Sequence, residues 1–515
     1  MNAQLIFAMC AILFIFVACL AVGNSYRILV IFPTGSYSHQ RPQQAISQGL
    51  AAAGHHVTII SPNTFPTTNP NITQIDVRFT YDYMKVFDLS ASIGPWGMHA
   101  LETIHRTNVA DGVLNHPPVT ELLKSGQQFD GIVMESLLHV PLFMAKEIFN
   151  ATLIGFTTLE MFPLLHSSMG NVIHPVLHPF FIYHTPKRIG FFDRIVMCYF
   201  DLYHRYWHHF EFLPSLDRII KKNFPGTKTT AWDLMKSFDF TIEGMSPVLG
   251  NVRPMVPNTI QVGFLHIAPP KPLPENLQNY LDRSKNGVIY LSFGSNVKSS
   301  ELKPEIKNTI IKVLRDLPYD ILWKFETPSM PDKPSNVRIE KWLPQQDILA
   351  HKNIKLFIMQ GGLQSMEETI DRGIPVVVIP FFGDQAANAE KIEDLGIGKK
   401  LNLEDLSYNS LKSCISEVIE NPKYKQTVKQ LGDRIRDTPM TPVQTAVWWI
   451  EYAIRNRGAE HLKYKGTDVP FIEYYLIDVI AVHLVGIFLV LYVLKKLFNM
   501  IRGGNSKTTK KMKKQ

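Results

Sequence analysis

Residues 342–385 read WLPQQDILAHKNIKLFIMQGGLQSMEETIDRGIPVVVIPFFGDQ, and this stretch decides the fold of the chain. Within it, Ile354 to Met359 is an apolar run that predicts a buried strand, and Leu363 to Arg372 has the periodicity of a helix. Between them, Gln360-Gly361-Gly362 predicts a tight turn whose glycines let the backbone approach a ligand closely. Because the helix begins at this turn, its free backbone N–H groups and positive dipole end predict a site for an anion such as phosphate.

A second apolar strand follows the helix and ends in polar side chains. Ile374 to Pro380 is followed by Phe381-Phe382-Gly383-Asp384-Gln385, which places a carboxylate and an amide at the same sheet edge. Ligands of open α/β sheets bind at that edge. An aromatic side chain, amides, a phosphate cradle and carboxylates in this order suit a nucleotide sugar.

This order resembles the signature of the UDP-glycosyltransferases (UDP-glucuronosyl/glucosyltransferases), enzymes that transfer a sugar from UDP to a small acceptor. The resemblance extends over nearly the whole chain, from an N-terminal signal to a C-terminal anchor. It implies an α/β fold of two facing Rossmann-like, doubly wound domains, the GT-B type, followed by a single transmembrane helix. It also implies that the donor is a UDP-sugar used as a co-substrate, with no bound cofactor.

The resemblance gives a role to each polar residue of the signature. Trp342 would stack on uracil, and Gln345 would hydrogen-bond the base. Phosphate would be bound by Gln360, Gly362 and Ser365. The ribose hydroxyls would be bound by Glu368, and the sugar hydroxyls by Asp384 and Gln385. If each residue is considered alone, a structural role explains it as well as donor binding does: Trp342 could be a core residue and Asp384 a loop cap. The ordered set of residues favours the donor site.

Two further positions bear on phosphate binding. Gly294 and Ser295 directly follow another predicted strand in the sequence SFGSN and are expected to add a phosphate contact, although a plain turn explains them equally well. Gln360 departs from the commonest family pattern, which has His. A Gln amide still donates a hydrogen bond to phosphate but cannot become a cation. Insect and baculoviral members tolerate Gln here, so we interpret this chain as an insect-like member.

Sugar transfer requires a base that removes the proton of the acceptor hydroxyl. His39 lies in the sequence TGSYSHQ, in a loop predicted between the first strand and the first helix, where the family has its catalytic His. On sequence alone, a surface or helix-capping His is the alternative. Glu135 ends the predicted strand FDGIVME, at a position where many relatives have Asp. It is expected to orient the imidazole of His39. The alternative is that Glu135 serves as a strand-end cap or as an ion-pair partner. The hypothesis is a direct, inverting displacement that needs no metal.

Alternating strands and helices predict two domains. Residues 24–263 form the expected acceptor-binding domain, which opens with a β-α-β pattern. Residues 264–283 form a linker around the proline-rich stretch Pro269 to Pro274, and residues 284–455 form the UDP-sugar-binding domain. No GxGxxG fingerprint follows any predicted strand, so a dinucleotide cofactor is not expected.

The two ends of the chain indicate a membrane protein. Residues 1–23 are interpreted as a signal peptide, residues 456–473 as a juxtamembrane segment, residues 474–494 as a transmembrane helix and residues 495–515 as a basic cytosolic tail. The tail has eight Lys and Arg residues and no acid, which equals the net charge of +8, so nucleic-acid binding is not indicated. The positive-inside rule then predicts a single-pass type I protein with lumenal domains. Residues 511–515 match a KxKxx retrieval signal, which favours the endoplasmic reticulum membrane.

An aromatic region, Pro179 to Phe212, stands between the motifs of the two domains. Its His204, His208 and His209 invite a metal interpretation, but no HExxH pattern completes it, and no metal site is expected. We expect an amphipathic helical layer that either forms the acceptor pocket or rests on membrane lipid. Asn71 and Asn150 begin glycosylation sequons that a lumenal location would make usable.

The expected activity is transfer of a hexose, with glucose preferred because the signature looks insect-like, to the hydroxyl of a small lipophilic acceptor. The alternative is a membrane-anchored UDP-sugar-binding partner with weak or no turnover, which Glu135 and Gln360 motivate. Homo- or hetero-oligomers remain open at this point.

Overall fold

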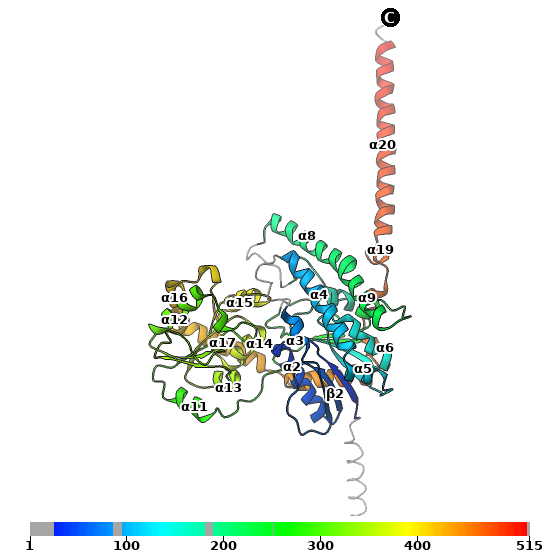
Figure 1. Cartoon of the computed structure of the whole chain (residues 1–515). Coiled ribbons are helices and arrows are strands. Elements are labelled where there is room, and N and C mark those ends of the chain that lie inside the picture. Colours follow the sequence, from blue (N-terminus) through cyan, green and yellow to red (C-terminus); the bar gives the residue numbers. More distant parts are fainter. Residues whose placement is uncertain (1–24, 86–94, 181–188, 251, 512–515) are drawn as a thin grey trace, which may run out of the picture. The chain divides into compact units, whose positions relative to one another are not determined.

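A computed structural model describes residues 25–85, 95–180, 189–250 and 252–511 (Figure 1). The chain divides into two units, residues 1–463 and residues 464–515, and each is described by itself. The predicted signal peptide and residues 512–515 of the predicted retrieval signal lie outside the described residues.

The first domain is built on a seven-stranded parallel sheet with the order β3-β2-β1-β4-β5-β6-β7. Its strands are β1 (Arg27–Ile31), β2 (His56–Ser61), β3 (Ile72–Asp76), β4 (Gly131–Glu135), β5 (Thr152–Thr157), β6 (Phe240–Glu243) and β7 (Thr259–Gln261). Its helices are α2 (Tyr37–Ala52), α3 (Thr80–Tyr83), α4 (Pro95–Leu114), α5 (Pro117–Lys124), η2 (Val140–Met144), α6 (Ala145–Phe149), α7 (Pro163–Met169), α8 (Phe191–Trp207), η3 (His208–Phe212), α9 (Leu213–Asn223) and α10 (Ala231–Lys236). The strand order reverses beside β1, so the loops after β1 and β4 flank a switch point.

The second domain repeats this plan with a six-stranded parallel sheet in the order β10-β9-β8-β11-β12-β13. Its strands are β8 (Val288–Ser292), β9 (Asp320–Lys324), β10 (Val337–Glu340), β11 (Ile354–Met359), β12 (Val376–Val378) and β13 (Gly398–Lys400). Its helices are α11 (Glu275–Asp282), α12 (Pro304–Arg315), α13 (Gln345–Leu349), α14 (Leu363–Arg372), α15 (Gln385–Asp394), α16 (Tyr408–Glu420) and α17 (Pro422–Arg436), with short η4 (Ser299–Glu301) and η5 (Leu403–Asp405). The two parallel sheets confirm the predicted fold class, and the switch point here lies between β8 and β11.

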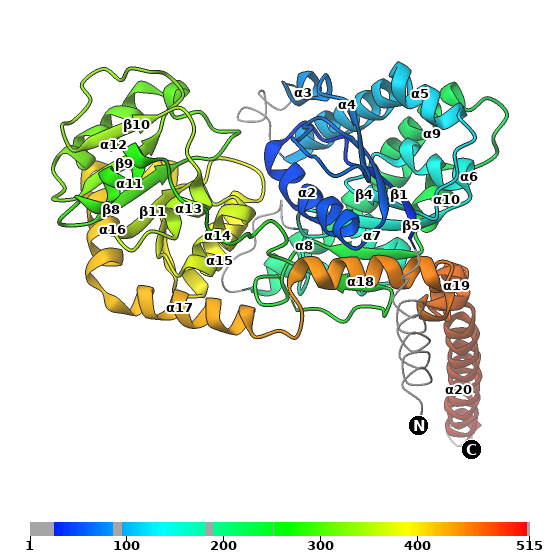
Figure 2. The same ribbon diagram turned by 90° about the horizontal axis from the view of Figure 1, so that it is seen from below.

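The last helix of the first unit, α18 (Pro442–Arg455), packs on the first sheet although the sequence grouped it with the second domain (Figure 2). Its buried Ile450 and Ala453 share one apolar core with Ile28 of β1. A Cβ at Gly131 would lie only 2.6 Å from the Ile454 side chain, so this glycine provides room for the helix. The apolar face of α18 was evident in the sequence, but periodicity does not say which sheet a helix covers.

The connection between the domains is partly helical. The predicted linker, residues 264–283, ends in α11, whose Leu277 and Leu281 are buried in the core of the second domain. The extended part of the connection is therefore the proline-rich stretch that precedes Glu275.

The second unit contains η7 (Lys465–Asp468), α19 (Phe471–Tyr474) and a long helix, α20 (Ile477–Lys511). Among the described residues, one helical stretch, Ile477–Ile501, is long and apolar enough to cross a membrane, as judged by length and composition. It begins three residues after the predicted start at 474 and continues beyond the predicted end at 494. A helix of 25 residues rises about 37 Å, which exceeds the roughly 30 Å of a hydrocarbon core.

The packing of α18 predicts a stability effect in the first domain. Replacing the fully buried Ile450 by Ala should lower the free energy of unfolding of that domain by about 2–5 kcal/mol, because the lost methyl groups leave a cavity. Urea unfolding followed by tryptophan fluorescence measures this change, and Arg455→Ala, at an exposed position on the same helix, is the control. A loss for Ile450→Ala no larger than for the control would contradict the packing of α18 on the first sheet.

Candidate active site

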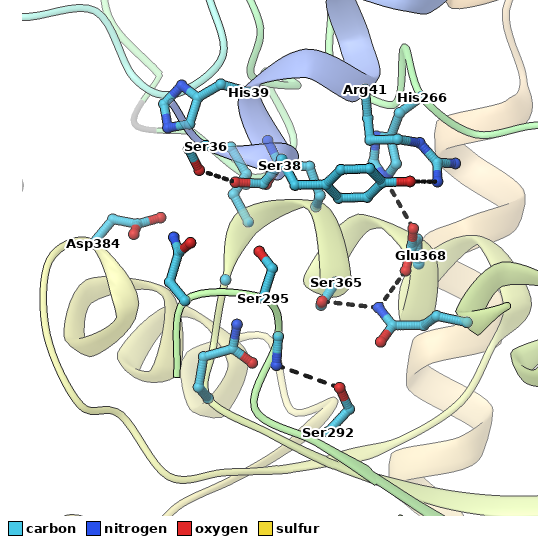
Figure 3. A pocket seen from close by; sticks show the side chains of 18 of the residues that line it. Ser36, Ser38, His39, Arg41, His266, Ser292, Ser295, Ser365, Glu368 and Asp384 are labelled. Carbon is cyan, nitrogen blue, oxygen red and sulfur yellow. Dashed lines mark hydrogen bonds and ion pairs between the residues drawn. The ribbon is translucent and has the colours of Figure 1, made fainter. Parts of the chain in front are cut away.

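A cavity of about 880 Å³ is lined by residues of both domains (Figure 3). The first domain contributes residues that follow β1 and residues of α4, and the second contributes residues that follow β8, β10, β11 and β12. The predicted site residues that line the cavity are His39, Gly294, Ser295, Trp342, Gln345, Gln360, Gly362, Ser365, Glu368, Asp384 and Gln385. Glu135 is fully buried behind the cavity wall, where it faces His39. The structure thus brings all twelve predicted residues together.

The tight turn predicted between β11 and α14 is present, and one of its two glycines has a positive φ. Gly361 has φ +95°, and a Cβ there would lie 2.9 Å from Val378. Gly294, with φ +78°, packs against the Gln360 side chain, and a Cβ at Gly294 would lie 2.3 Å from Gln360 Nε2. The Nδ2 of Asn388 donates to the Gly361 carbonyl at 2.9 Å and holds the turn from α15. The loops after β8 and β11 are therefore packed together at the switch point.

Gln345, Ser365 and Glu368 form one hydrogen-bonded network on the donor side of the cavity. The Nε2 of Gln345 donates to Ser365 Oγ at 2.9 Å and to Glu368 Oε2 at 2.5 Å. The hydroxyl of Tyr290, in β8, donates to Gln345 Oε1 at 3.1 Å. The amide of Gln345 is therefore fixed in orientation before any ligand binds.

Two residues that the sequence did not single out, His266 and Gln346, support Glu368. His266 comes from the interdomain connection, and its Nε2 lies 3.3 Å from Glu368 Oε1. Gln346 Nε2 donates to the same oxygen at 3.0 Å and to the His266 carbonyl at 3.0 Å. Burial by itself would raise the pKa of Glu368, but His266, Gln345 and Gln346 outweigh it and hold that pKa below the usual value. Glu368 is thus kept ionised, and its charge strengthens the hydrogen bonds that its oxygens accept.

The neighbouring carboxyl, Glu367, has the opposite character. Full burial raises its pKa to about 7, although His266 and the Phe264 backbone N–H act in the other direction. The Phe264 N–H donates to Glu367 Oε1 at 2.9 Å. Glu367 therefore ties the interdomain connection to α14, while Glu368 faces the cavity.

Trp342 lines the cavity with 57% of its surface exposed, so its indole is available for stacking. The edge-to-face contact with Tyr37, at 5.2 Å between ring centroids, comes from the first domain. The Lys324 ammonium lies 5.9 Å from the indole centroid. An aromatic platform of this kind suits a nucleobase.

Asp384 and Gln385 begin α15 at the opposite end of the donor side. Gln385 Oε1 accepts hydrogen bonds from the Phe381 and Phe382 backbone N–H groups at 2.9 and 3.2 Å, so the NH₂ end of this amide is the one available to a ligand. Asp384 Oδ2 accepts from Asn388 at 2.7 Å. Burial raises the pKa of Asp384, while Asn388 and the nearby His39 of the first domain act to lower it.

His39 lies in the first turn of α2, because that helix begins at Tyr37. The sequence pattern predicts a helix that begins only at Gln40, so the predicted loop position of His39 was wrong. His39 Nδ1 lies 3.5 Å from Glu135 Oε1 and forms a short hydrogen bond with the Thr158 hydroxyl. Glu135 Oε2 accepts from the Thr34 backbone N–H at 3.0 Å. Both partners contact Nδ1, which leaves Nε2 as the nitrogen available to a substrate.

The first-domain end of the cavity combines apolar and polar side chains. Met84, Leu137, Leu159 and Phe162 are the apolar members, and Glu102, His105 and Arg106 are the polar ones. Arg106 Nη2 lies 3.5 Å from Glu102 Oε1 on α4. Burial, reinforced by Arg106 and His39, lowers the pKa of His105 to about 2, so this ring is neutral at physiological pH. The spacing of these three residues, i, i+3 and i+4 on one helix face, was the sequence signal that could have identified them.

Within the described residues, no group of three or more His, Cys, Asp or Glu side chains is arranged to hold a metal ion. His204 and His208 are buried on α8 and η3 among aromatic rings.

Comparisons with known proteins agree with this geometry. The family model described as UDP-glucoronosyl and UDP-glucosyl transferase matches residues 27–515. The UDP-glycosyltransferase UGT5 of Dactylopius coccus is 32% identical over 96% of this chain and 97% of its own length. The ecdysteroid UDP-glucosyltransferase of the Spodoptera littoralis nuclear polyhedrosis virus is 31% identical over 90% of this chain and 94% of its own length. The solved structure of the glycosyltransferase VinC in complex with DTDP has a TM-score of 0.58 at 16% identity, over 83% of this chain and all of that chain, and supports the fold alone.

Two Rossmann-like domains that share one cavity at their switch points define the GT-B fold. The chain belongs to the UDP-glucuronosyl and UDP-glucosyl transferase family. It is a UDP-glycosyltransferase, and its donor is a UDP-sugar.

The network around Glu368 predicts a donor-binding defect. Glu368→Gln should weaken UDP binding by about 10- to 100-fold, because an amide has one acceptor oxygen and no charge, whereas the carboxylate has two acceptor oxygens and a charge. Isothermal titration calorimetry with UDP measures the effect. Glu301→Gln, at an exposed carboxyl on η4, is the matched control and should bind like the unchanged chain. Equal affinities for the two variants would exclude Glu368 from the donor site.

Proposed function

We propose that this UDP-glycosyltransferase transfers glucose from UDP-glucose to a hydroxyl of a small lipophilic acceptor, with His39 as the general base. The observation that carries the proposal is the placement of His39, backed by Glu135 and Thr158, across one cavity from Asp384 and the donor signature.

The proposed reaction is a single displacement at the anomeric carbon. His39 Nε2 takes the proton of the acceptor hydroxyl as its oxygen attacks that carbon, and Glu135 stabilises the imidazolium that forms. The bond from the anomeric carbon to the UDP oxygen breaks, and UDP leaves with the electron pair. Attack opposite the leaving group inverts the configuration, so an α-linked donor gives a β-glycoside.

Leaving-group stabilisation is assigned to the turn at Gln360. Helix α14 begins at Leu363 with Gly362 as its N-cap, and both residues line the cavity. The free backbone N–H groups of its first turn and the positive end of the helix dipole are therefore assigned to the diphosphate. Ser295, Gln360 and Ser365 add side-chain donors around the same space. Because Gln360 is neutral, the charge of the departing UDP is balanced by backbone groups and the helix dipole rather than by an imidazolium.

The remaining donor contacts follow the order of the signature. Trp342 is assigned to stack on uracil and Gln345 to bond its edge, with Glu368 on the ribose and Asp384 with Gln385 on the sugar. The preference for glucose is supported by the viral relative whose name specifies a UDP-glucosyltransferase. The apolar side chains Leu137, Leu159 and Phe162 at the first-domain end of the cavity support a lipophilic acceptor.

The proposed location is the endoplasmic reticulum membrane, with the catalytic unit in the lumen. The predicted signal peptide, the apolar helix α20 and the basic residues that follow it support this topology. Asn150 is exposed, so its sequon would be accessible to glycosylation there. The close His39–Glu135 pair supports turnover rather than UDP-sugar binding without transfer.

Replacing His39 by Ala should reduce kcat by about 10²- to 10⁴-fold while UDP affinity stays within a factor of two, because the base contacts the acceptor and not the nucleotide. Mass spectrometry of products from a panel of UDP-sugars and phenols measures transfer and identifies the preferred sugar. Wild-type turnover in the variant would reject His39 as the base.

Glu135→Gln should lower kcat by roughly 10²-fold or more with little change in the KM for UDP-sugar, since the amide cannot stabilise an imidazolium. Thr158→Val removes the second contact to Nδ1 and should cost less, about 10-fold, because the carboxylate remains. The pH dependence of kcat separates the two variants. An unchanged rate in Glu135→Gln would show that Glu135 serves only the Thr34 backbone.

A further inference from the structure

A buried guanidinium lies at the first-domain end of the cavity and makes few contacts. Arg106 belongs to α4, lines the cavity and is only 7% exposed. Its Nη1 lies 3.5 Å from His139 Nε2, and its Nη2 lies 3.5 Å from Glu102 Oε1. Within the described part of the chain, Arg106 Nε has no hydrogen-bond partner. Both contacts are longer than an ordinary hydrogen bond, and the guanidinium carries more N–H donors than they use.

A purely structural role for Arg106 does not explain this arrangement. An arginine that stabilises a fold through a carboxylate usually meets it at about 2.8 Å with two parallel hydrogen bonds. Here burial lowers the pKa of Arg106, although Glu102 and Glu135 act in the other direction. A buried donor that stays without an acceptor costs free energy. Because this guanidinium lines a cavity, a ligand in the cavity can supply the missing acceptor.

Arg106 stands among the residues assigned to the acceptor. Leu159 and Phe162 line the same cavity, and the Phe162 ring centroid is 5.9 Å from the guanidinium carbon of Arg106. Arg106 and His39 both act to lower the pKa of His105, so the guanidinium and the assigned base lie near the same ring. A lipophilic molecule with its reacting hydroxyl at His39 can therefore place a second group at Arg106.

The charges around Arg106 favour a neutral oxygen over a carboxylate as that second group. Glu102 lies within ion-pair distance, and the fully buried Glu135 is a second carboxylate that acts on the same guanidinium. Burial holds the pKa of His105 at about 2 and that of His139 well below the usual value, so neither ring adds positive charge. A further anion beside two carboxylates would be repelled. A carbonyl or hydroxyl oxygen accepts a hydrogen bond without that repulsion.

We propose that Arg106 binds a second, neutral oxygen of the acceptor, so that the acceptors are lipophilic molecules with a carbonyl or hydroxyl remote from the hydroxyl that is glycosylated. This inference rests on the proposed function, because it takes the lipophilic acceptor and the base His39 from it. Arg106 is then a specificity-determining residue, which selects among acceptors and takes no part in proton transfer.

Matched pairs of phenols test the proposal in the unchanged full chain. Each pair consists of a para-alkylphenol and its ketone analogue, with the carbonyl at increasing distance from the ring and too remote to change the acidity of the phenol. With the UDP-sugar that the chain uses best, the ketone of at least one pair should have a kcat/KM about 10-fold or more above that of its alkyl partner, because the alkyl chain leaves the guanidinium without an acceptor. The analogue with a terminal carboxylate should gain no such advantage.

Arg106→Met removes the guanidinium and keeps a side chain of similar length. The ketone preference should fall below about twofold, whereas Arg106→Lys keeps a donor group and should retain part of it. Both members of a pair use the same base and donor, so their ratio is insensitive to any change at Glu135. Replacing a buried charge by an apolar side chain is often neutral for stability, and UDP affinity within a factor of two verifies folding. Arg218→Met, at an exposed position on α9, is the matched control and should keep the full preference.

Equal kcat/KM within every pair in the unchanged chain would overturn the proposal, and this result does not depend on any variant. A ketone preference that persists in Arg106→Met would also overturn it, because another group would then bind the oxygen. In both cases transfer to the alkylphenols would leave the proposed function standing. Transfer to neither member of any pair would overturn the lipophilic acceptor of the proposed function together with this inference.

Discussion

The packing of Gln360 against Gly294 is the contact on which the donor side of this enzyme depends. It joins the loops after β8 and β11, the two strands that flank the switch point of the second sheet. A Cβ at Gly294 would meet the amide end of Gln360, and the positive φ of this residue favours glycine, so the two loops pack closely beside the start of α14. Asn388 fixes the same turn from the far side through the Gly361 carbonyl. The donor signature is thus held by contacts between loops, each positioned by a buried strand.

The first domain solves a similar problem with different chemistry. Here the group at the switch point is an imidazole in the first turn of α2, and its orientation depends on a buried carboxylate at the end of β4 and a hydroxyl after β5. The distance of 3.5 Å between His39 Nδ1 and Glu135 Oε1 shows that the Glu135 side chain reaches the imidazole from the end of β4.

The sequence predicted the central strands and α14 well, because those segments are short apolar runs bounded by glycine or proline, and Leu363–Arg372 was found with the predicted bounds. It did not predict edge strands such as β3 and β13, whose side chains are half exposed and carry no clear alternation. The site residues were found by motif. His266 and Thr158 were not, because each acts through a partner far away in the chain, Glu368 and His39. Such supporting contacts become visible only when the fold brings distant segments together.

The packing of α18 on the first sheet has consequences for folding during synthesis and for the design of chimaeras. Until residues 442–455 leave the ribosome, Ile28, Val30 and Ile154 lack the apolar cover that Ile450 and Ala453 supply. The first domain is synthesised before the second, but its apolar core is completed only after the whole second domain has emerged. A chimaera joined at the proline-rich connection alone would pair one parent's sheet with the other parent's α18, so exchange of acceptor domains between relatives requires two crossover points.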